Sequence, residues 1–264
     1  MPEGHTVHRT ENDFNKLFAG HKLRVDSPQG RFGSDARLID NRKLMRARAI
    51  GKQLFLEFEG GLTLRIHLGI YGKWQLHPAG DWPEVKGQVR ARFASPLAIA
   101  ELRGPTACEV IDASEVASIE NRLGPDPLNP DRGGKERSRF IDRVGASKQP
   151  IGLLLMNQDV VAGIGNVYRA ELLFRAGIEP HTPGNALPTD LVEALWDDAV
   201  KLLKVGVKTG FMITRDELFT KRPSKADRNW VYKRQGEPCR ACGSKIRLEE
   251  MATRKLYWCP TCQR

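Results

Sequence analysis

The chain has 264 residues, 40% of them hydrophobic and 28% charged, which is ordinary for a globular protein with two or three domains. Its 42 Lys and Arg against 32 Asp and Glu give a net charge of +10, which favours a polyanionic partner such as nucleic acid, although an inert basic surface would give the same charge. No run approaches the roughly 20 apolar residues of a membrane span. The N-terminus also lacks the apolar core of a signal peptide, so we expect a cytoplasmic protein without membrane contact.

The first part of the chain predicts one leading helix followed by strands. Residues 5–19 carry apolar side chains at helical spacing, and Gly20 is suited to end the helix. Residues 62–68 alternate between apolar and polar side chains, as in a half-buried strand, and two further strand-like runs lie between residues 88 and 102. We therefore expect an N-terminal β-sandwich domain over residues 1–114.

The rest of the chain predicts a change of architecture. Residues 121–134 are rich in Pro and Gly and indicate a linker, and three apolar stripes beyond them indicate helices. We place a helical domain at residues 115–222. Residues 216–235 are polar and basic without a clear period and predict a long loop. The expected fold class is α+β with several domains, ending in a small domain at residues 229–264.

Four of the five cysteines form two matched pairs near the C-terminus, Cys239-x2-Cys242 and Cys259-x2-Cys262. Two such turns let four thiolates meet one tetrahedral ion, so the spacing predicts a single structural Zn²⁺ without an open coordination position. The segment is too short to fold on apolar burial alone, and the metal would supply its stability. Two disulfides or a redox pair are the alternatives. Cys108 lies far from this set and is interpreted as a small buried hydrophobe.

The residues between the two cysteine pairs predict a β-hairpin with Arg254 and Lys255 near its turn. A basic tip is suited to a phosphate or groove contact, whereas two solvated charges are the simpler interpretation. Upstream, Gly163 and Gly165 precede a helix that is predicted to open at or near Asn166. Free N–H groups at a helix N-terminus bind phosphate, although a tight turn between helices accounts for these residues equally well.

The N-terminus offers a possible nucleophile. Met1 precedes the small residue Pro2, so we expect its removal, which exposes a secondary amine. Such an amine can attack C1′ of a deoxyribose and form an iminium. It must be neutral to do so, and a cation such as Lys52 or a helix N-terminus would lower its pKa. Glu3 is suited to protonate the opening sugar. By itself, a Pro at this position is common and indicates little.

Together these features resemble one family. The chain is similar over essentially its whole length to the formamidopyrimidine-DNA glycosylase and endonuclease VIII family. The matching segments are MPEGHTVHR, Gly51-Lys52, His67 to Trp74 (HLGIYGKW), Leu123 to Leu128 (LGPDPL), Ala162 to Glu171 (AGIGNVYRAE) and Tyr257 to Pro260 (YWCP). The resemblance implies a β-sandwich, a helix–two-turn–helix domain and a zinc finger, with DNA held in the cleft between the domains.

The resemblance also implies roles for individual residues. Pro2 would attack C1′ and displace the damaged base, and Glu3 would act as the acid that opens the sugar. Lys52 would contact phosphate and assist β-elimination. Arg254 matches the zinc-finger arginine that binds phosphates flanking the lesion and is linked to δ-elimination. Asn166 matches an asparagine that contacts the same backbone.

Four further residues are expected to contact DNA. Arg122 and His67 lie in or beside matching motifs. Because a stacked base cannot be reached by an N-terminal amine, the nucleotide must be flipped out of the duplex. Ile70 would then fill the hole as an apolar wedge, with Tyr71 stacked beside it. A buried strand end is the alternative for Ile70, but the glycines on either side favour an exposed turn.

Two departures from the family patterns bear on the branch and on base selectivity. The formamidopyrimidine branch carries Asp-Pro-Arg-Arg-Phe in a late loop of its first domain, where residues 102–106 here read LRGPT. Together with Tyr71 this points to the endonuclease VIII branch, which favours oxidised pyrimidines. Gly69 departs from the endonuclease VIII branch, whose members commonly carry Gln at this position, so we expect weaker reading of the opposite base and activity on single-stranded DNA as well as duplex.

The expected protein is a monomeric bifunctional DNA glycosylase and abasic-site lyase of base excision repair, acting by β,δ-elimination in a bacterial-type cytoplasm. Two alternatives remain open on the sequence. One is a non-catalytic zinc-finger DNA-binding protein with the same fold. The other is a cysteine-metal redox module, which the absence of a thioredoxin-like pattern disfavours.

Overall fold

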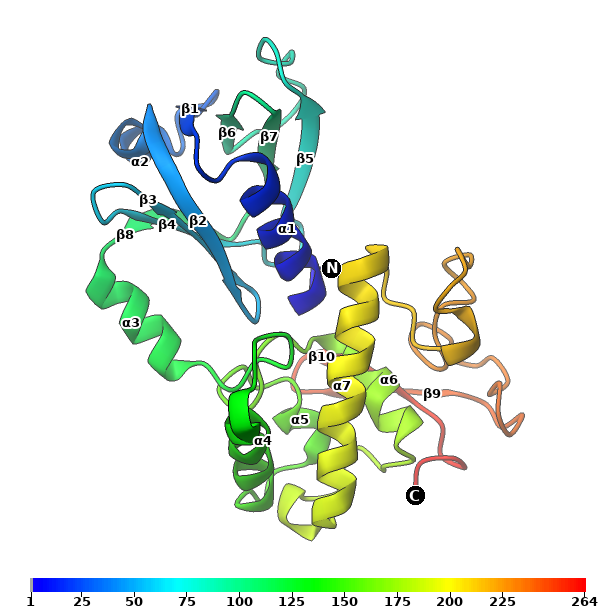
Figure 1. Ribbon diagram of the computed structural model, residues 1–264. Coiled ribbons are helices and arrows are strands. Elements are labelled where there is room, and N and C mark those ends of the chain that lie inside the picture. The colour runs from blue at the N-terminus through cyan, green and yellow to red at the C-terminus, as the bar shows by residue number, and fades with distance from the viewer. Residues whose placement is uncertain (1) are drawn as a thin grey trace. The chain divides into compact units, whose positions relative to one another are not determined.

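The computed structural model describes residues 2–264, and Met1 lies outside the described residues. The chain divides into two compact units, a first unit of residues 1–122 and a second unit of residues 123–264 (Figure 1). Among residues 2–264, no helix combines the length and the apolar character that crossing a membrane would require.

The first unit is built on antiparallel strands in the order β5-β7-β6-β1-β2-β3-β4-β8. Strand β1 pairs with both β2 and β6 and so joins two half-sheets, whose inward faces share one apolar core. This arrangement confirms the predicted β-sandwich. The strands are β1 (Lys22–Asp26), β2 (Arg42–Ile50), β3 (Gln53–Phe58), β4 (Thr63–His67), β5 (Lys73–Pro78), β6 (Ala91–Ala94), β7 (Ala98–Arg103) and β8 (Ala107–Ile111).

Helix α1 (Gly4–Leu17) leads the first unit and confirms the predicted amphipathic helix. Its apolar face enters the core through Phe14, whose ring lies 4.7 Å from that of Phe18 and 4.8 Å from that of Trp74 between centroids. The helix ends shortly before Gly20, which has a φ of 85°, a value that favours glycine because it has no Cβ. Helix α2 (Gly33–Ile39) lies between β1 and β2 in the chain.

The stretch predicted as a linker differs from expectation. Its first residues end helix α3 (Ala113–Arg122), and the next, Leu123 to Pro127, are buried in the second unit. The N–H of Gly124 donates to the carbonyl of Gln158 (2.8 Å), and a Cβ at Gly124 would lie 2.6 Å from the carbonyl carbon of Val160. Pro and Gly therefore mark an irregular segment here, but one that is closely packed.

The second unit contains helices around a separate core, followed by a two-stranded hairpin. The predicted apolar stripes lie on α4, α6 and α7, and most of their buried side chains form one cluster. The elements are η1 (Arg132–Gly134), α4 (Lys135–Gly145), α5 (Ile151–Leu154), α6 (Asn166–Arg175), η2 (Gly184–Ala186), α7 (Thr189–Thr209), η3 (Asp216–Leu218), β9 (Arg247–Met251) and β10 (Arg254–Trp258). The hairpin packs against α6 through a third apolar cluster.

Candidate functional site

The start of α1 presents the residues expected to carry the chemistry. Glu3 directly precedes the helix and is fully buried. Its carbonyl accepts a hydrogen bond from the N–H of Thr6 (2.9 Å), which closes the first turn. Pro2 lies next to it and is partly exposed. The terminal residues are thus held against the positive end of a helix, where an acidic side chain is favoured.

Lys52 lies in the turn between β2 and β3, one residue before the strand at whose start it was predicted. Ile50 pairs with Gln53 across the hairpin, which leaves Gly51 and Lys52 as a two-residue turn. Gly51 has a φ of 58°. Two-residue turns with a positive φ match the twist of the flanking strands. Gly51 therefore allows the tight turn that positions Lys52.

The packing of α1 on β2 places the start of α1 and the Gly51-Lys52 turn at the same end of the first unit. The chain after α1 returns to the start of β2, and the side chain of Asn15 exchanges hydrogen bonds of 2.7 and 2.9 Å with the backbone of Ala47. From Asn15 back to Glu3 the helix spans about 18 Å. From Ala47 forward, β2 spans about 10 Å to Ile50, and the turn with Lys52 follows directly. The start of α1 and the turn between β2 and β3 lie at the same end of the first unit (Figure 1).

His67 extends this end of the sheet. It pairs with Gln53, the residue after Lys52, and its carbonyl accepts from the N–H of Thr106 (2.8 Å). Burial lowers the pKa of His67, and the positive charges of Arg65 and Lys52 lower it further. Both effects favour the neutral form of the imidazole.

The turn between β4 and β5 is exposed, as the flanking glycines predicted. Ile70 is 46% exposed and Tyr71 is 84% exposed. Gly69 has a φ of 62°, and a Cβ there would lie 1.9 Å from Oγ1 of Thr106. A Cβ at Gly72 would lie 2.2 Å from the carbonyl oxygen of Leu68. Both glycines are thus required by close backbone approach, and they leave two large apolar side chains in solvent.

Asn166 is the first residue of α6, as predicted, but its side chain is already engaged within the second unit. It is buried, and its Nδ2 donates to the carbonyl of Lys255 (2.8 Å). Its Oδ1 accepts from the guanidinium of Arg169, which also donates to the Lys255 carbonyl at 3.3 Å. Asn166 therefore ties the start of α6 to the hairpin directly beside Arg254.

Two buried charged residues of α6 were not singled out from the sequence. Arg169 is fully buried and links Asn166 to the hairpin. Glu171 is also fully buried, and its carboxylate accepts from the N–H groups of Trp230, Val231 and Tyr232 at 2.7 to 2.9 Å. The long loop predicted at residues 216–235 is thus fixed at its end. Both residues lie in the AGIGNVYRAE segment, where charged side chains on a glycine-led helix were the only sequence indication.

The two arginines expected to contact DNA are both exposed. Arg254 begins β10 and pairs with Met251 across a turn formed by Ala252 and Thr253, which have φ values of 47° and 61°. Arg122 is the last residue of α3 in the first unit. The hairpin with a basic tip is as predicted.

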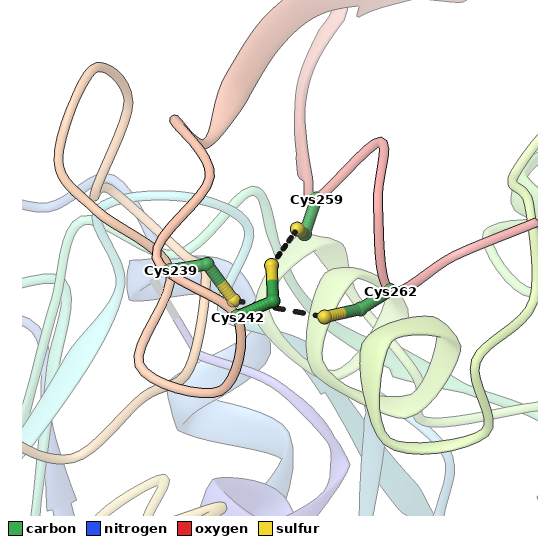
Figure 2. Close-up of side chains that lie close together, drawn as sticks. All are labelled: Cys239, Cys242, Cys259 and Cys262. Atoms are coloured by element: carbon green, nitrogen blue, oxygen red, sulfur yellow. Dashed lines mark hydrogen bonds between the residues drawn. The ribbon is translucent and has the colours of Figure 1, made fainter.

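The four cysteines converge as their spacing predicted (Figure 2). Their sulfur atoms all lie within 4.8 Å of one another, with 3.9 Å between Cys239 and Cys262 and 3.5 Å between Cys242 and Cys259. Four sulfurs at about 2.3 Å from a tetrahedral Zn²⁺ would be about 3.8 Å apart, so the set fits one structural zinc. Cys108 packs against the sandwich core, and burial raises the pKa of its thiol to about 12.

Three known protein families match successive segments of the chain. Residues 1–108 match the formamidopyrimidine-DNA glycosylase N-terminal domain, residues 123–217 the formamidopyrimidine-DNA glycosylase H2TH domain, and residues 236–264 a zinc finger found in FPG and IleRS. The fold and the four-cysteine zinc site thus define a zinc-finger protein of the DNA-repair glycosylase class.

Relatives and solved structures agree. Endonuclease 8 1 of Mycobacterium bovis is 46% identical over all of both chains. Formamidopyrimidine-DNA glycosylase of Thermus thermophilus is 30% identical over 100% of this chain and 98% of its own. The Lactococcus lactis Fpg structure with abasic-site DNA has a TM-score of 0.82 at 24% identity, covering 99% of each chain, and shows the shared fold. The chain belongs to the formamidopyrimidine-DNA glycosylase and endonuclease 8 family.

Proposed function

We propose that the protein excises oxidised bases from damaged DNA and then cleaves the strand at the resulting abasic site. The observation that carries this proposal is that the start of α1, which Pro2 and Glu3 precede, and the Gly51-Lys52 turn lie at the same end of the first unit. An amine nucleophile, a carboxyl acid and a phosphate-binding cation are the groups that base displacement through an iminium needs.

In the proposed reaction the Pro2 nitrogen forms a bond to C1′, and the bond from C1′ to the base breaks, so that the base leaves. Glu3 delivers a proton to the ring oxygen as the sugar opens, which leaves an iminium between Pro2 and C1′. Loss of a proton from C2′ then breaks the 3′ C–O bond, and a second elimination breaks the 5′ C–O bond. Lys52 holds phosphate during the first elimination, and Arg254 assists the second.

The remaining contacts are proposed to hold the flipped nucleotide. Ile70 and Tyr71 are exposed on a turn between two closely packed glycines, as a wedge between bases requires. Arg122, His67 and Asn166 are proposed to contact DNA nearby. Asn166 would act with its own side chain bonded to the hairpin, so part of its effect would come from positioning Arg254.

Oxidised pyrimidines are the proposed preferred substrates. The relative named Endonuclease 8 1 is more similar to this chain, at 46% identity, than the Thermus formamidopyrimidine-DNA glycosylase, at 30%. The absent Phe wedge between residues 102 and 106 supports the same branch. A panel of defined lesions in duplex and single-stranded DNA would test this preference, and faster excision of an oxidised purine would contradict it.

The covalent step is tested by borohydride trapping on abasic-site DNA. Protein with a verified Pro2 terminus should give a stable adduct, because the reductant converts the iminium to an amine. Glu3→Gln should lose base excision more than it loses abasic-site cleavage, because the acid is needed most when the base leaves. Excision and cleavage are followed on labelled oligonucleotides.

Two controls make the trapping result decisive. Protein that retains Met1 has an amide at the Pro2 nitrogen and should bind DNA without forming an adduct. Pro2→Gly should trap only weakly. If protein with a free Pro2 amine binds abasic DNA but gives no adduct, the enzyme proposal fails, and a non-catalytic DNA-binding protein with the same fold takes its place.

A further inference from the structure

The turn that exposes Ile70 and Tyr71 lies against a second turn of the first unit. Residues 68–72, the wedge turn, connect β4 to β5, and residues 104–106, the second turn, connect β7 to β8. The last residue of β4 pairs with the first residue of β8, and the first residue of β5 pairs with the last residue of β7. Both turns therefore run between the same two pairs of strands.

Thr106 makes one contact between the two turns, at Gly69. Its N–H donates to the carbonyl of His67 (2.8 Å), the residue before the wedge turn. A Cβ at Gly69 would lie 1.9 Å from Oγ1 of Thr106 and 3.1 Å from its Cβ. The side chain of Thr106 thus occupies the space that a side chain at residue 69 would need, and it lies directly on the glycine backbone.

Gly104 makes the other contact, at Tyr71. It has a φ of 57°, which favours glycine. A Cβ at Gly104 would lie 3.5 Å from the carbonyl oxygen of Tyr71 and 3.8 Å from its Cβ. Pro105, which follows, is buried. The second turn therefore meets the wedge turn at the residues on both sides of Ile70.

The contact at Gly69 is the one that a side chain makes, because Gly104 has none. A side chain that enters a base stack must be held at a defined height, and small displacements of positioned groups cost much activity. We propose that Thr106 is a positioning residue, which holds the wedge turn where Ile70 can enter the DNA stack. This inference rests on the proposed wedge role of Ile70 and Tyr71.

The role predicts a dependence on the second DNA strand. In a duplex, a flipped nucleotide leaves a hole opposite its partner base, and the wedge fills it. Single-stranded DNA has no such hole. Thr106→Ala should therefore lower base excision from duplex DNA about tenfold, as expected for a displaced positioning contact. Cleavage of an abasic site in single-stranded DNA should stay as in the original protein.

Fluorescence of 2-aminopurine tests the position of the wedge without cleavage. The probe is a DNA duplex that carries a tetrahydrofuran analogue of the abasic site, with 2-aminopurine as the opposite base. Its emission rises when the base is unstacked. The original full-length protein should raise the emission at saturation, and Thr106→Ala should lose most of this rise. Ile70→Ala, which removes the wedge itself, should lose it as well.

Two further variants separate positioning from other roles. Thr106→Val keeps the bulk beside Gly69 and should behave as the original protein. A loss as large as that of Thr106→Ala would assign the effect to a hydrogen bond of the hydroxyl and overturn the positioning role. Ser34→Ala removes an exposed hydroxyl on α2, and this matched control should change neither emission nor excision. Because Thr106 is exposed, its truncation should leave the melting temperature unchanged.

The outcomes distinguish this inference from the proposed function. An emission rise in Thr106→Ala equal to that of the original protein would overturn the inference and leave the proposed function standing. If the original protein binds the duplex without raising the emission, the wedge role of Ile70 fails and this inference fails with it. Borohydride trapping still decides the covalent step in either case.

Discussion

At the residue scale, the start of α1 is unusual because Glu3, His5 and His8 are all buried there. His8 faces Glu11 at 3.2 Å, and Nε2 of His5 lies 3.2 Å from Oγ1 of Thr6. Polar groups are buried only where the fold pairs them or holds them neutral. Their presence beside Pro2 indicates that this end of the helix is built around polar groups rather than around the core alone.

His5 should make the protein less stable in acid. Burial lowers its pKa from 6.5 to about 4, and nearby positive charge, including that of Arg9, adds to the effect. The folded protein therefore holds a neutral imidazole, and the unfolded chain takes up a proton first as the pH falls. The contribution of the neutral His5 to the free energy of unfolding is fully present above pH 6.5 and is lost as the pH falls toward 4. The loss amounts to about 3 kcal/mol if His5 acts alone.

Urea unfolding at neutral and acidic pH measures this contribution. His5→Gln should be less sensitive to acid than the original protein between pH 6.5 and pH 4, because its amide does not titrate. His21→Gln serves as the control on a residue outside the helix and should keep the original pH dependence. Equal pH dependence in all three proteins would show that His5 is not held neutral by the fold.

At the element scale, the hairpin of β9 and β10 is positioned by α6 rather than by its own residues. The Lys255 carbonyl accepts from both Asn166 and Arg169, and the side chains of Tyr257 and Phe174 share an apolar cluster. A two-stranded hairpin alone is only marginally stable. The contacts with α6 therefore determine where the tip, and with it Arg254, is held.

Arg254→Ala should weaken DNA binding to all sequences about equally and reduce the slope of log affinity against log salt by roughly one, because one phosphate contact is lost. Fluorescence anisotropy over a range of salt concentrations measures the slope. Arg247→Ala, at an exposed position on the other strand of the hairpin, is the matched control. A slope that Arg254→Ala does not change would remove this residue from the phosphate contacts.

Arg169→Met should destabilise the second unit by about 1–3 kcal/mol, because buried oxygens of Asn166 and Lys255 lose a donor. The melting temperature should fall by several degrees, and DNA binding should weaken because the hairpin tip is no longer fixed. Arg139→Met removes an exposed arginine of α4 and should have little effect on either quantity. An unchanged melting temperature for Arg169→Met would contradict the linking role of this residue.

At the scale of the whole molecule, each unit has an apolar core of its own. The zinc finger belongs to the second unit and packs against its helix α6. Cys239 and Cys259 are buried in the same cluster as Ala170 and Phe174 of α6. The cysteines of the metal site therefore also form part of the apolar contact with α6. Loss of the metal or of this contact should allow the hairpin to move away from α6.

Removal of zinc by a chelator should therefore melt the finger and weaken DNA binding while the sandwich remains folded. Circular dichroism follows the structural change, and anisotropy with a DNA duplex follows the affinity. Added Zn²⁺ should restore both. Cys108→Ser, outside the metal site, should behave as the original protein does. Undiminished DNA affinity in metal-free protein would argue against a role of the finger in binding.

The sequence by itself determined the features that depend on local spacing. The helical period of residues 5–19, the alternation of residues 62–68 and the paired cysteines each impose a local geometry, and the structure has all three. The glycines around Ile70 and Tyr71 likewise predicted an exposed turn, because their positions require a backbone without Cβ. The arrangement of the domains was inferred from the resemblance of the motifs to a known family.

Only the tertiary structure decided which distant groups meet. Nothing in the local sequence indicates that Asn166 bonds to a carbonyl some ninety residues later, that Glu171 closes a long loop, or that residues 123–127 are packed rather than exposed. These contacts arise because buried polar groups must find partners wherever the cores bring them. The position of Glu3 relative to Lys52 is likewise set by the packing of α1 on β2.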